Sequence, residues 1–415
     1  MIKIRMESST AVVVLIGLMA MIGFSACTQT QQTGEEMEWL GAWSTAQQLV
    51  EPRNMPPEPG LSGNTIRQVI QVNMGGDTLR LSLSNAFGTK PVAIHSVHVA
   101  QSTDSSAIDA GTDLALSFDG ESSVTIQPGE RVFSEPFSFD LEALSRLSIT
   151  MHVDSVSSDL TGHPGSRTTS YIVNGDAVSA ENMPNAAQTN HWYLIDAIDV
   201  KAPEHFAAVA VLGNSITDGR GSGTNKQNRW PDELAKRLQA NDSTDHISVL
   251  NQGIGGNCVL KACLGPAAVD RFERDVLDQP GVEWLIILEG INDIGGVRSE
   301  EHADQVVSDL KAAYKEMVEK AHQEDIKVYG ATLMPFGESF YDRPESERAR
   351  QEVNDWIRNS GVFDAVIDLD KALGDPENPT QLLPKGDTGD HLHPNETGHR
   401  LIAEAIDLSL FLEEE

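Results

Sequence analysis

The sequence has 415 residues, a length that suits two ordinary domains better than one. Hydrophobic residues make up 40% and charged residues 22%, which predicts a folded protein with a buried core. The 62 acidic residues outnumber the 30 basic residues and leave a formal net charge of −32. A surface of this charge repels nucleic acid and anionic membranes, so we exclude both as direct partners. The scattered acidic residues are typical of a solvated surface, and adaptation to high salt would give the same pattern.

The N-terminus has the features of an export signal. Lys3 and Arg5 precede an apolar run over residues 11–24 that is too short to cross a bilayer comfortably. The run ends in Phe24-Ser25-Ala26-Cys27, which resembles the lipobox of bacterial lipoproteins. The resemblance implies a lipid on Cys27 and anchoring to the bacterial cell envelope, facing the periplasm or the exterior. An ordinary secretory peptide is the alternative, and both predict that the protein leaves the cytoplasm.

Two regions of different pattern follow the predicted signal peptide of residues 1–26. Residues 27–38 are polar and predict a tether. Residues 39–200 contain short alternating runs between turn residues, without convincing helical periodicity, which predicts an all-β sandwich of jelly-roll type as an accessory domain. A boundary is expected near residues 200–205. The expected strands are 65–73, 78–84, 96–100, 114–118, 123–126, 131–139 and 147–153.

Residues 206–415 alternate continuous apolar runs with amphipathic segments. Strands buried on both faces are expected at 207–212 and 285–288. The alternation predicts a three-layer α/β/α domain with a mainly parallel sheet and helices on both faces. Further strands are expected at 246–250, 327–333 and 365–369, and helices at 231–239, 267–277, 300–323, 345–359 and 401–412.

Polar segments follow the ends of the expected strands in this second region. Residues 213–219, 251–257 and 289–293 each come after an apolar run, and residues 390–394 precede the last helix. Ligands of open parallel sheets bind beyond the carboxyl ends of the strands, so we expect the four segments to converge. Together they supply a hydroxyl, glycine amides, a carboxamide, a carboxylate and an imidazole, which are the groups that acyl transfer requires.

Each of these groups has a predicted role. Ser215 is the expected nucleophile, His393 the base that takes its proton, and Asp390 the acceptor that orients the imidazole. Two simpler interpretations remain open. Ser215 could serve merely as the cap of a helix, without a catalytic role, and His391 could be the base in place of His393. The segment around Asp390 does not suggest a metal site, because further ligands at suitable spacing are missing from the sequence.

These segments are similar to the motifs of the SGNH hydrolases, also called the GDSL family, over about half of the chain. The matching residues are Gly213-Asn214-Ser215, Gly256, residues 290–293, and Asp390 with His393. One departure is Asn214, where the family name has Asp. The resemblance implies a flavodoxin-like fold without cofactor or metal. It also implies a catalytic triad of Ser215, Asp390 and His393. The implied oxyanion hole consists of the Ser215 amide, the Gly256 amide and the Asn292 side chain.

The β-rich first half together with residues 212–219 and 386–394 resembles a two-domain, acetylxylan-esterase-like group within this family. This implies a serine esterase that removes short acyl groups, chiefly acetyl, from plant polysaccharides or oligosaccharides such as acetylated xylan. A lipase or thioesterase is one alternative, although the polar, glycine-rich loops favour a short acyl group. A non-catalytic, carbohydrate-binding surface lipoprotein is the other.

Two cysteines remain if Cys27 carries lipid. Cys258 and Cys263 are close enough to pair in an oxidising compartment, and two free thiols are the alternative. They follow Gly256 closely, so a bridge between them would restrain the loop that carries an expected oxyanion donor. Asp293 is expected to bind nearby backbone amides, and Trp230 to pack at the start of a helix.

Overall fold

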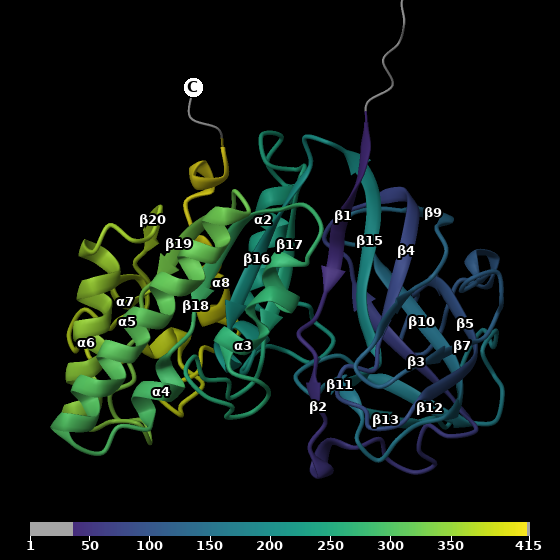
Figure 1. The fold of residues 1–415 in the computed structure, drawn as a ribbon, viewed down its shortest axis with the longest axis horizontal. Coiled ribbons are helices and arrows are strands. Elements are labelled where there is room, and N and C mark those ends of the chain that lie inside the picture. The colour runs from purple at the N-terminus through teal and green to yellow at the C-terminus, as the bar shows by residue number, and fades with distance from the viewer. Residues whose placement is uncertain (1–35, 413–415) are drawn as a thin grey trace, which may run out of the picture. The chain divides into compact units, whose positions relative to one another are not determined.

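The computed structural model describes residues 36–412 (Figure 1). Residues 1–35 and 413–415 lie outside the described part of the chain, and with them the predicted signal peptide, Cys27 and most of the predicted tether. No helix within residues 36–412 is long and apolar enough to cross a membrane.

The first half of the described chain consists of antiparallel strands in two main sheets and one small sheet. One sheet has the order β1(Met37–Ser44), β15(Ile195–Pro203), β4(Gly76–Ser84) and β8(Arg131–Phe133), and β9(Phe137–Leu141) also pairs with β4. The second has the order β13(Ala187–Thr189), β12(Ser170–Asn174), β3(Asn64–Gln71), β10(Arg146–Ser155), β5(Val92–Gln101) and β6(Leu114–Ala115), with β7(Val124–Ile126) on β5. The small sheet joins β14(Trp192–Tyr193), β11(Thr161–His163) and β2(Gln48–Leu49).

Alternating apolar residues place the core between the two main sheets. Leu79, Leu81 and Leu83 point to one face of β4 and are fully buried. They share a core with Ile66 of β3 and Ile149 of β10, which come from the opposite sheet. The predicted β-sandwich is therefore confirmed.

Several strand bounds in this half differ from the expected ones. The expected strand 131–139 is divided into β8 and β9, because Pro136 between them has no N–H for the ladder. Met37 and Glu38, assigned to the tether, belong to β1 and pair with Pro203 and Ala202. These partners belong to β15, which ends at Pro203, within the range of 200–205 expected for the boundary.

The second half contains a five-stranded parallel sheet. Its order is β17(Ile247–Gly253), β16(Ala207–Gly213), β18(Val282–Leu288), β19(Lys327–Ala331) and β20(Ala365–Ile367). In chain order this is 2-1-3-4-5, the flavodoxin-like order, which confirms the predicted fold class. All residues of β16 are buried, as its continuous apolar sequence predicts.

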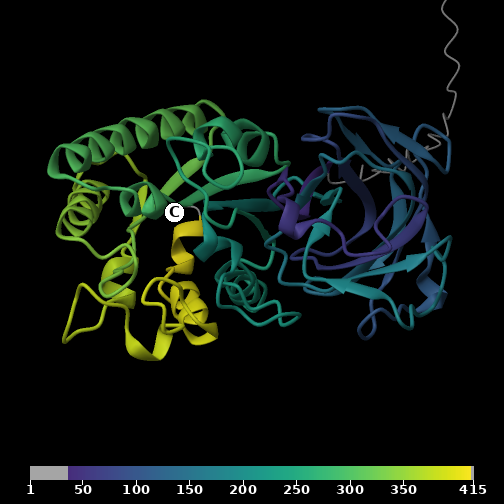
Figure 2. The ribbon, with the colours of Figure 1, turned by 90° about the horizontal axis from the view of Figure 1, so that it is seen from below.

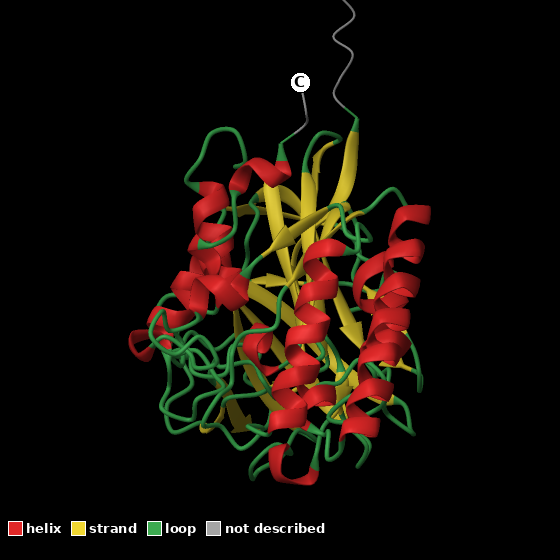
Figure 3. Ribbon diagram, turned by 90° about the vertical axis from the view of Figure 1, so that its left-hand side faces the viewer, coloured by secondary structure: helices red, strands yellow, loops and turns green. Residues whose placement is uncertain are grey.

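Helices cover both faces of this sheet (Figures 2 and 3). The first face carries α5(Glu300–Gln323) and α6(Pro344–Asn359), with α3(Ala268–Phe272) and α4(Ile291–Gly295) beside α5. The second face carries α2(Trp230–Gln239) and α8(Glu396–Glu404), with α7(Leu369–Leu373) beside α8. Trp230 begins α2 and is buried, as expected.

The expected last helix over 401–412 is wrong in its bounds. The Asn395 side chain accepts hydrogen bonds from the backbone N–H groups of Thr397 and Gly398, so α8 begins at Glu396. After Glu404, Asp407 caps a separate 3₁₀ turn, Leu408–Phe411. The early start matters for the site, because it fixes the segment that carries His393 directly before a helix.

The sandwich is attached to the edge strand β17. Thr45, just after β1, forms a parallel bridge with Asn251, and Gln252 Nε2 donates to Ser44 Oγ at 2.6 Å. The Gly41 N–H also donates to the Pro280 carbonyl at 3.0 Å. These contacts cover an otherwise open sheet edge and bring β2 and β11 toward the carboxyl ends of the parallel strands.

Candidate active site

Ser215 lies where β16 ends and the short helix α1(Ser215–Asp218) begins. Asn214 caps this helix, because its Oδ1 accepts a hydrogen bond from the Ile216 N–H at 3.1 Å. Asn214 Nδ2 donates to Glu289 Oε2 at 2.6 Å. Asn214, and not Ser215, therefore caps this helix, and the Ser215 hydroxyl remains available for a different contact.

Glu289 directly follows β18 and accepts a hydrogen bond from Asn214, the residue before the nucleophile. Its carboxyl group is buried, and burial raises the pKa of Glu289 to about 8. Near neutral pH the carboxyl group is therefore protonated, and Asn214 contacts an uncharged partner. An amide at position 214 can donate this hydrogen bond, which a carboxylate could not.

Ser215, His393 and Asp390 form a chain of hydrogen-bonding contacts. Ser215 Oγ lies 2.9 Å from His393 Nε2, and His393 Nδ1 lies 2.7 Å from Asp390 Oδ2. Asp390 Oδ1 accepts from the backbone N–H of His393 at 2.9 Å and from the Thr388 hydroxyl at 2.9 Å. The spacing of three residues lets one turn hold both the carboxylate and the imidazole that it orients.

His391, the alternative base, lies elsewhere. Its Nδ1 lies 2.8 Å from Asp387 Oδ2, and it is not among the residues that line the cavity beside Ser215. Its backbone has φ +60°, so the turn directs the side chains of His391 and His393 differently. The geometry favours His393.

Electrostatics at this site favour a charged Asp390 and a neutral His393. Partial burial alone would raise the pKa of Asp390, but hydrogen bonds from the backbone and imidazole of His393 hold it well below its usual value. Burial lowers the pKa of His393, Asp390 counteracts this, and Arg220 and Arg167 lower it further. A neutral imidazole next to a hydroxyl can accept its proton.

These shifts predict the acid side of the pH profile. The imidazole is active in its neutral form, and its lowered pKa keeps that form populated at lower pH. We expect kcat/KM to reach half its maximum below pH of about 6.5, the ordinary histidine value. Arg220→Gln should move the midpoint upward, because it removes a positive charge that disfavours the imidazolium. A midpoint above the ordinary value in the unmodified protein would contradict this assignment.

Asn292 is held so that one amide hydrogen remains available. Its Nδ2 donates to the Asn257 carbonyl at 2.6 Å, and its Oδ1 accepts from the Tyr341 hydroxyl at 2.8 Å. The two contacts determine which end of the amide is nitrogen, and a primary amide has a second N–H. Ser215, Gly256 and Asn292 line the same cavity of about 420 Å³. Its volume lies in the range of small-molecule sites.

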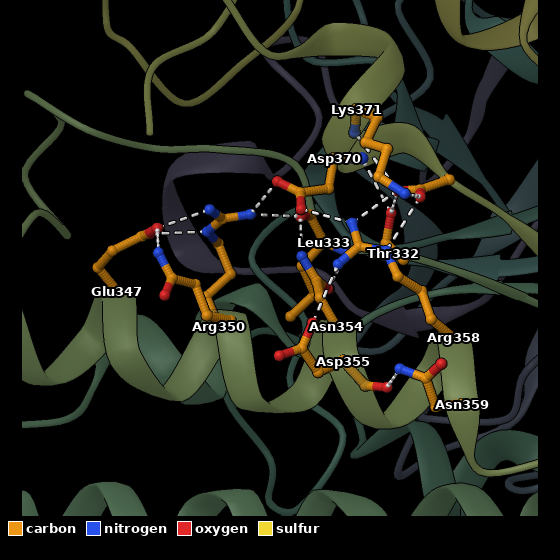
Figure 4. Close-up of polar contacts among 12 residues, drawn as sticks. Thr332, Leu333, Glu347, Arg350, Asn354, Asp355, Arg358, Asn359, Asp370 and Lys371 are labelled. Carbon is orange, nitrogen blue, oxygen red and sulfur yellow. Dashed lines mark hydrogen bonds and ion pairs between the residues drawn. The ribbon is translucent and has the colours of Figure 1, made fainter. Parts of the chain in front are cut away.

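The sequence did not indicate Tyr341, which comes from a loop after β19. Figure 4 shows how that loop starts: Arg350 and Asn354 of α6 both donate to the Leu333 carbonyl, at 3.0 and 2.8 Å. Arg350 and Arg358 also bind the Asp370 carboxylate. α6 thereby fixes the chain that leads to Tyr341. A lone tyrosine in a loop carries no sequence signal for this role.

The loop that carries Gly256 is restrained at several points. Asn257 Nδ2 donates to the carbonyls of Leu264 and Pro266, at 2.8 and 2.7 Å. Asp293 accepts from the backbone amides of Val259 and Leu260, at 2.8 and 3.1 Å, which is the role expected for it. Gly256 has φ +74°, a conformation that glycine adopts readily.

A disulfide joins Cys258 and Cys263 in the same loop. We expect Cys258→Ser with Cys263→Ser to lower kcat, because a mobile Gly256 amide stabilises developing charge less well. Closing so short a loop contributes about 2 kcal/mol by the chain-entropy model, so the melting temperature should change by a few degrees at most. Free-thiol titration of the unfolded, unreduced protein checks the bridge. Full kcat in the double variant would contradict its catalytic role.

The sandwich supplies one wall of the cavity, which the sequence also did not indicate. Glu51, Arg53, Arg167 and His191 of the sandwich line it together with Ser215. The connection between the halves is direct, because His163 Nε2 of β11 lies 2.9 Å from Asp218 Oδ1 at the end of α1. Both side chains are buried.

Comparison with known proteins gives the family of the second half. Residues 211–401 match the model of the GDSL-like lipase/acylhydrolase family. The chain carries a GDSL-like acylhydrolase domain. This domain spans β16 to α8 and includes Ser215, Asn292, Asp390 and His393. A search of curated proteins found no match.

Solved structures similar to this chain include other GDSL hydrolases. A lipase/acylhydrolase from Enterococcus faecalis is 20% identical with a TM-score of 0.38, over 48% of this chain and 93% of that one. A GDSL-like lipase from Bacteroides thetaiotaomicron is 20% identical with a TM-score of 0.35, over 48% and 84%. An acetylxylan esterase from Geobacillus stearothermophilus is 22% identical with a TM-score of 0.36, over 48% and 91%.

Proposed function

We propose that this GDSL acylhydrolase is a serine esterase that removes acetyl groups from plant polysaccharides or oligosaccharides, such as acetylated xylan. The observation that carries the proposal is the alignment of Ser215 Oγ, His393 and Asp390 at the edge of a cavity of about 420 Å³. The cavity is lined mainly by polar and glycine residues, with Leu264, Phe340 and Leu392 among its few apolar ones. This lining suits a sugar with a small acyl group better than a long acyl chain.

The proposed reaction has two halves. Ser215 Oγ attacks the ester carbonyl while His393 Nε2 takes the hydroxyl proton, and Asp390 stabilises the imidazolium that forms. The negative oxygen of the tetrahedral intermediate accepts hydrogen bonds from the amides of Ser215 and Gly256 and from the Asn292 side chain.

His393 then gives its proton to the sugar oxygen, which leaves as an alcohol, and the acetyl group remains on Ser215. In the second half a water molecule loses a proton to His393 and attacks the carbonyl of the acetyl-serine. The bond to Ser215 Oγ then breaks, acetate leaves, and His393 returns the proton to Ser215 Oγ. No step needs a cofactor or a metal ion.

A substrate panel tests this proposal. We expect kcat/KM for p-nitrophenyl esters to be highest for acetate and to fall with each added pair of carbons, and we expect acetate release from acetylated xylan. A maximum at eight carbons or more would support a lipase or thioesterase instead. Turnover of none of these esters by folded protein would favour the non-catalytic carbohydrate-binding alternative.

We also propose that the protein is exported and anchored to the cell envelope through Cys27, on the basis of the motif at residues 24–27. Mass spectrometry of protein extracted from membranes should find a mature N-terminal Cys27 that carries a diacylglycerol group. Cys27→Ser should release the protein from the membrane fraction. A mature N-terminus elsewhere on a fully soluble protein would contradict the anchor and leave the proposed activity unaffected.

A further inference from the structure

Three arginines line the cavity beside Ser215, and their charges are poorly compensated. Within residues 36–412, Arg53 and Arg220 are the only arginines whose side chains have neither a hydrogen bond nor an ion pair. Arg167 has a single carboxylate neighbour, Asp218, at 3.6 Å, which exceeds a normal hydrogen bond. Its Nε atom is buried without a partner. Each guanidinium offers five N–H donors, so this cavity has unused donors for an anion.

The two carboxylates that line this cavity, Glu51 and Asp218, have other hydrogen-bonding contacts, although Asp218 Oδ2 has no hydrogen bond. Glu51 accepts hydrogen bonds from Gln48 Nε2 at 2.9 Å and from Asn54 Nδ2 at 2.7 Å. Asp218 Oδ1 contacts His163 Nε2, and the Nδ1 of the same ring lies 2.8 Å from the Ala46 carbonyl. A carbonyl oxygen can only accept, so His163 Nδ1 carries a hydrogen and donates it to Ala46.

Arg167 is fixed in a strained conformation. Its φ of +52° lies in the left-handed region, which costs free energy for a residue with a side chain. The Asn225 N–H donates to the Arg167 carbonyl at 2.9 Å, and the Ser166 hydroxyl donates to the Thr168 carbonyl at 3.0 Å. The loop therefore holds Arg167 at the cavity wall, as expected for a side chain that positions a ligand.

The arginines share the cavity with the expected general base. Arg167 and Arg220 line the same cavity as His393, and their charges lower the pKa of its imidazole. His393 must reach the oxygen of the departing alcohol to protonate it. In an acetylated carbohydrate that alcohol is the sugar, so cations in the cavity beside His393 are available to contact the sugar.

We propose that Arg53, Arg167 and Arg220 bind an anionic group on the sugar that carries the ester, and that this group is the carboxylate of a uronic acid. The inference rests on the proposed function and narrows its substrate to acidic acetylated saccharides. A guanidinium matches a carboxylate through two parallel hydrogen bonds. The overall charge of −32 does not prevent this, because charges beyond about 8 Å are screened at physiological ionic strength, whereas the arginines are at the site.

The kinetic test uses matched acetylated glycosides that differ only at C6: a uronic acid, the neutral hexose, and the hexose 6-sulfate. Wild-type protein should prefer the uronic acid over the neutral sugar by roughly 10- to 100-fold in kcat/KM, the range of one charged hydrogen bond. Arg167→Gln and Arg220→Gln should each reduce this ratio, and Arg167→Lys should retain part of it. Arg400→Gln is the matched control, because Arg400 is exposed on α8 and does not line the cavity. If the hexose 6-sulfate is preferred over the neutral sugar as strongly as the uronic acid is, the site recognises negative charge and does not distinguish a carboxylate. That result would overturn the uronate assignment.

A binding test separates this inference from the proposed function. Titration calorimetry of the Ser215→Ala protein with trigalacturonate and with neutral xylotriose needs no turnover. We expect Ser215→Ala to bind trigalacturonate at least about 10-fold more tightly than xylotriose, and we expect the Ser215→Ala/Arg167→Gln double variant to lose this difference. That result would support the arginine site even if ester hydrolysis failed. Equal affinity for both sugars, or unchanged trigalacturonate affinity in the folded arginine variant, would overturn the inference while the esterase proposal stands.

Discussion

Ser215→Ala and His393→Ala should each lower kcat for p-nitrophenyl acetate by about 10⁴ to 10⁶. The reason is the contact of 2.9 Å between Ser215 Oγ and His393 Nε2, which makes the hydroxyl and the imidazole one functional unit. The Ser215→Ala/His393→Ala double variant should therefore lose little more than either single variant. The measurement is steady-state kinetics on variants whose melting temperatures match that of the unmodified protein.

Two controls accompany this prediction. His391→Ala removes the neighbouring imidazole, which contacts Asp387 and does not line the cavity, so it should retain most of the activity. Ser243→Ala changes an exposed serine in the loop before β17 and should have no effect. A large loss in His391→Ala with near-normal turnover in His393→Ala would reverse the assignment of the base.

Asn292→Ala should lower kcat by about 10² to 10³ with little change in KM, as expected for one oxyanion donor. The amide helps only when charge develops on the substrate oxygen, so its loss affects the transition state more than substrate binding. Tyr341→Phe should have a smaller effect, about 10-fold, because it leaves Asn292 in place and removes the hydrogen bond that orients it.

The control for Asn292 is Asn359→Ala, which removes an amide on the surface of α6 that donates to the Asp355 carbonyl. It should leave kcat unchanged. A rise in KM without loss of kcat in Asn292→Ala would show that Asn292 binds the substrate and does not stabilise the oxyanion. Full activity in Tyr341→Phe would show that the Asn257 contact orients the amide by itself.

The parallel sheet could be predicted because the residues that indicate each strand and the loop after it are adjacent in the sequence. The continuous apolar sequence of β16 and the motif residues directly after it indicate both a buried strand and a loop at its carboxyl end. Asp390 and His393 lie three residues apart, so one turn determines their geometry. The alternation over residues 131–139 predicted one strand, but Pro136 lies in the gap between β8 and β9 and directly precedes β9.

The wall of the cavity could not be predicted, because its residues are distant in sequence and have no motif. Arg167 reaches the site through the attachment of the sandwich to β17, and Tyr341 through a loop held by α6. In both cases a polar side chain acquires its role from tertiary packing that only the folded chain shows. His163 is a further example, since its partner Asp218 is 55 residues away.

Covalent labelling can identify the nucleophile of this acylhydrolase domain, and we expect it to be Ser215. An active-site-directed organophosphonate ester should add one phosphonyl group to each chain, and peptide mapping by mass spectrometry should place it on Ser215. The Ser215→Ala variant should remain unlabelled, and His393→Ala should react far more slowly because the hydroxyl lacks its base. Hydrolysis of acetyl esters by a protein that labels at another residue, or does not label at all, would contradict the account.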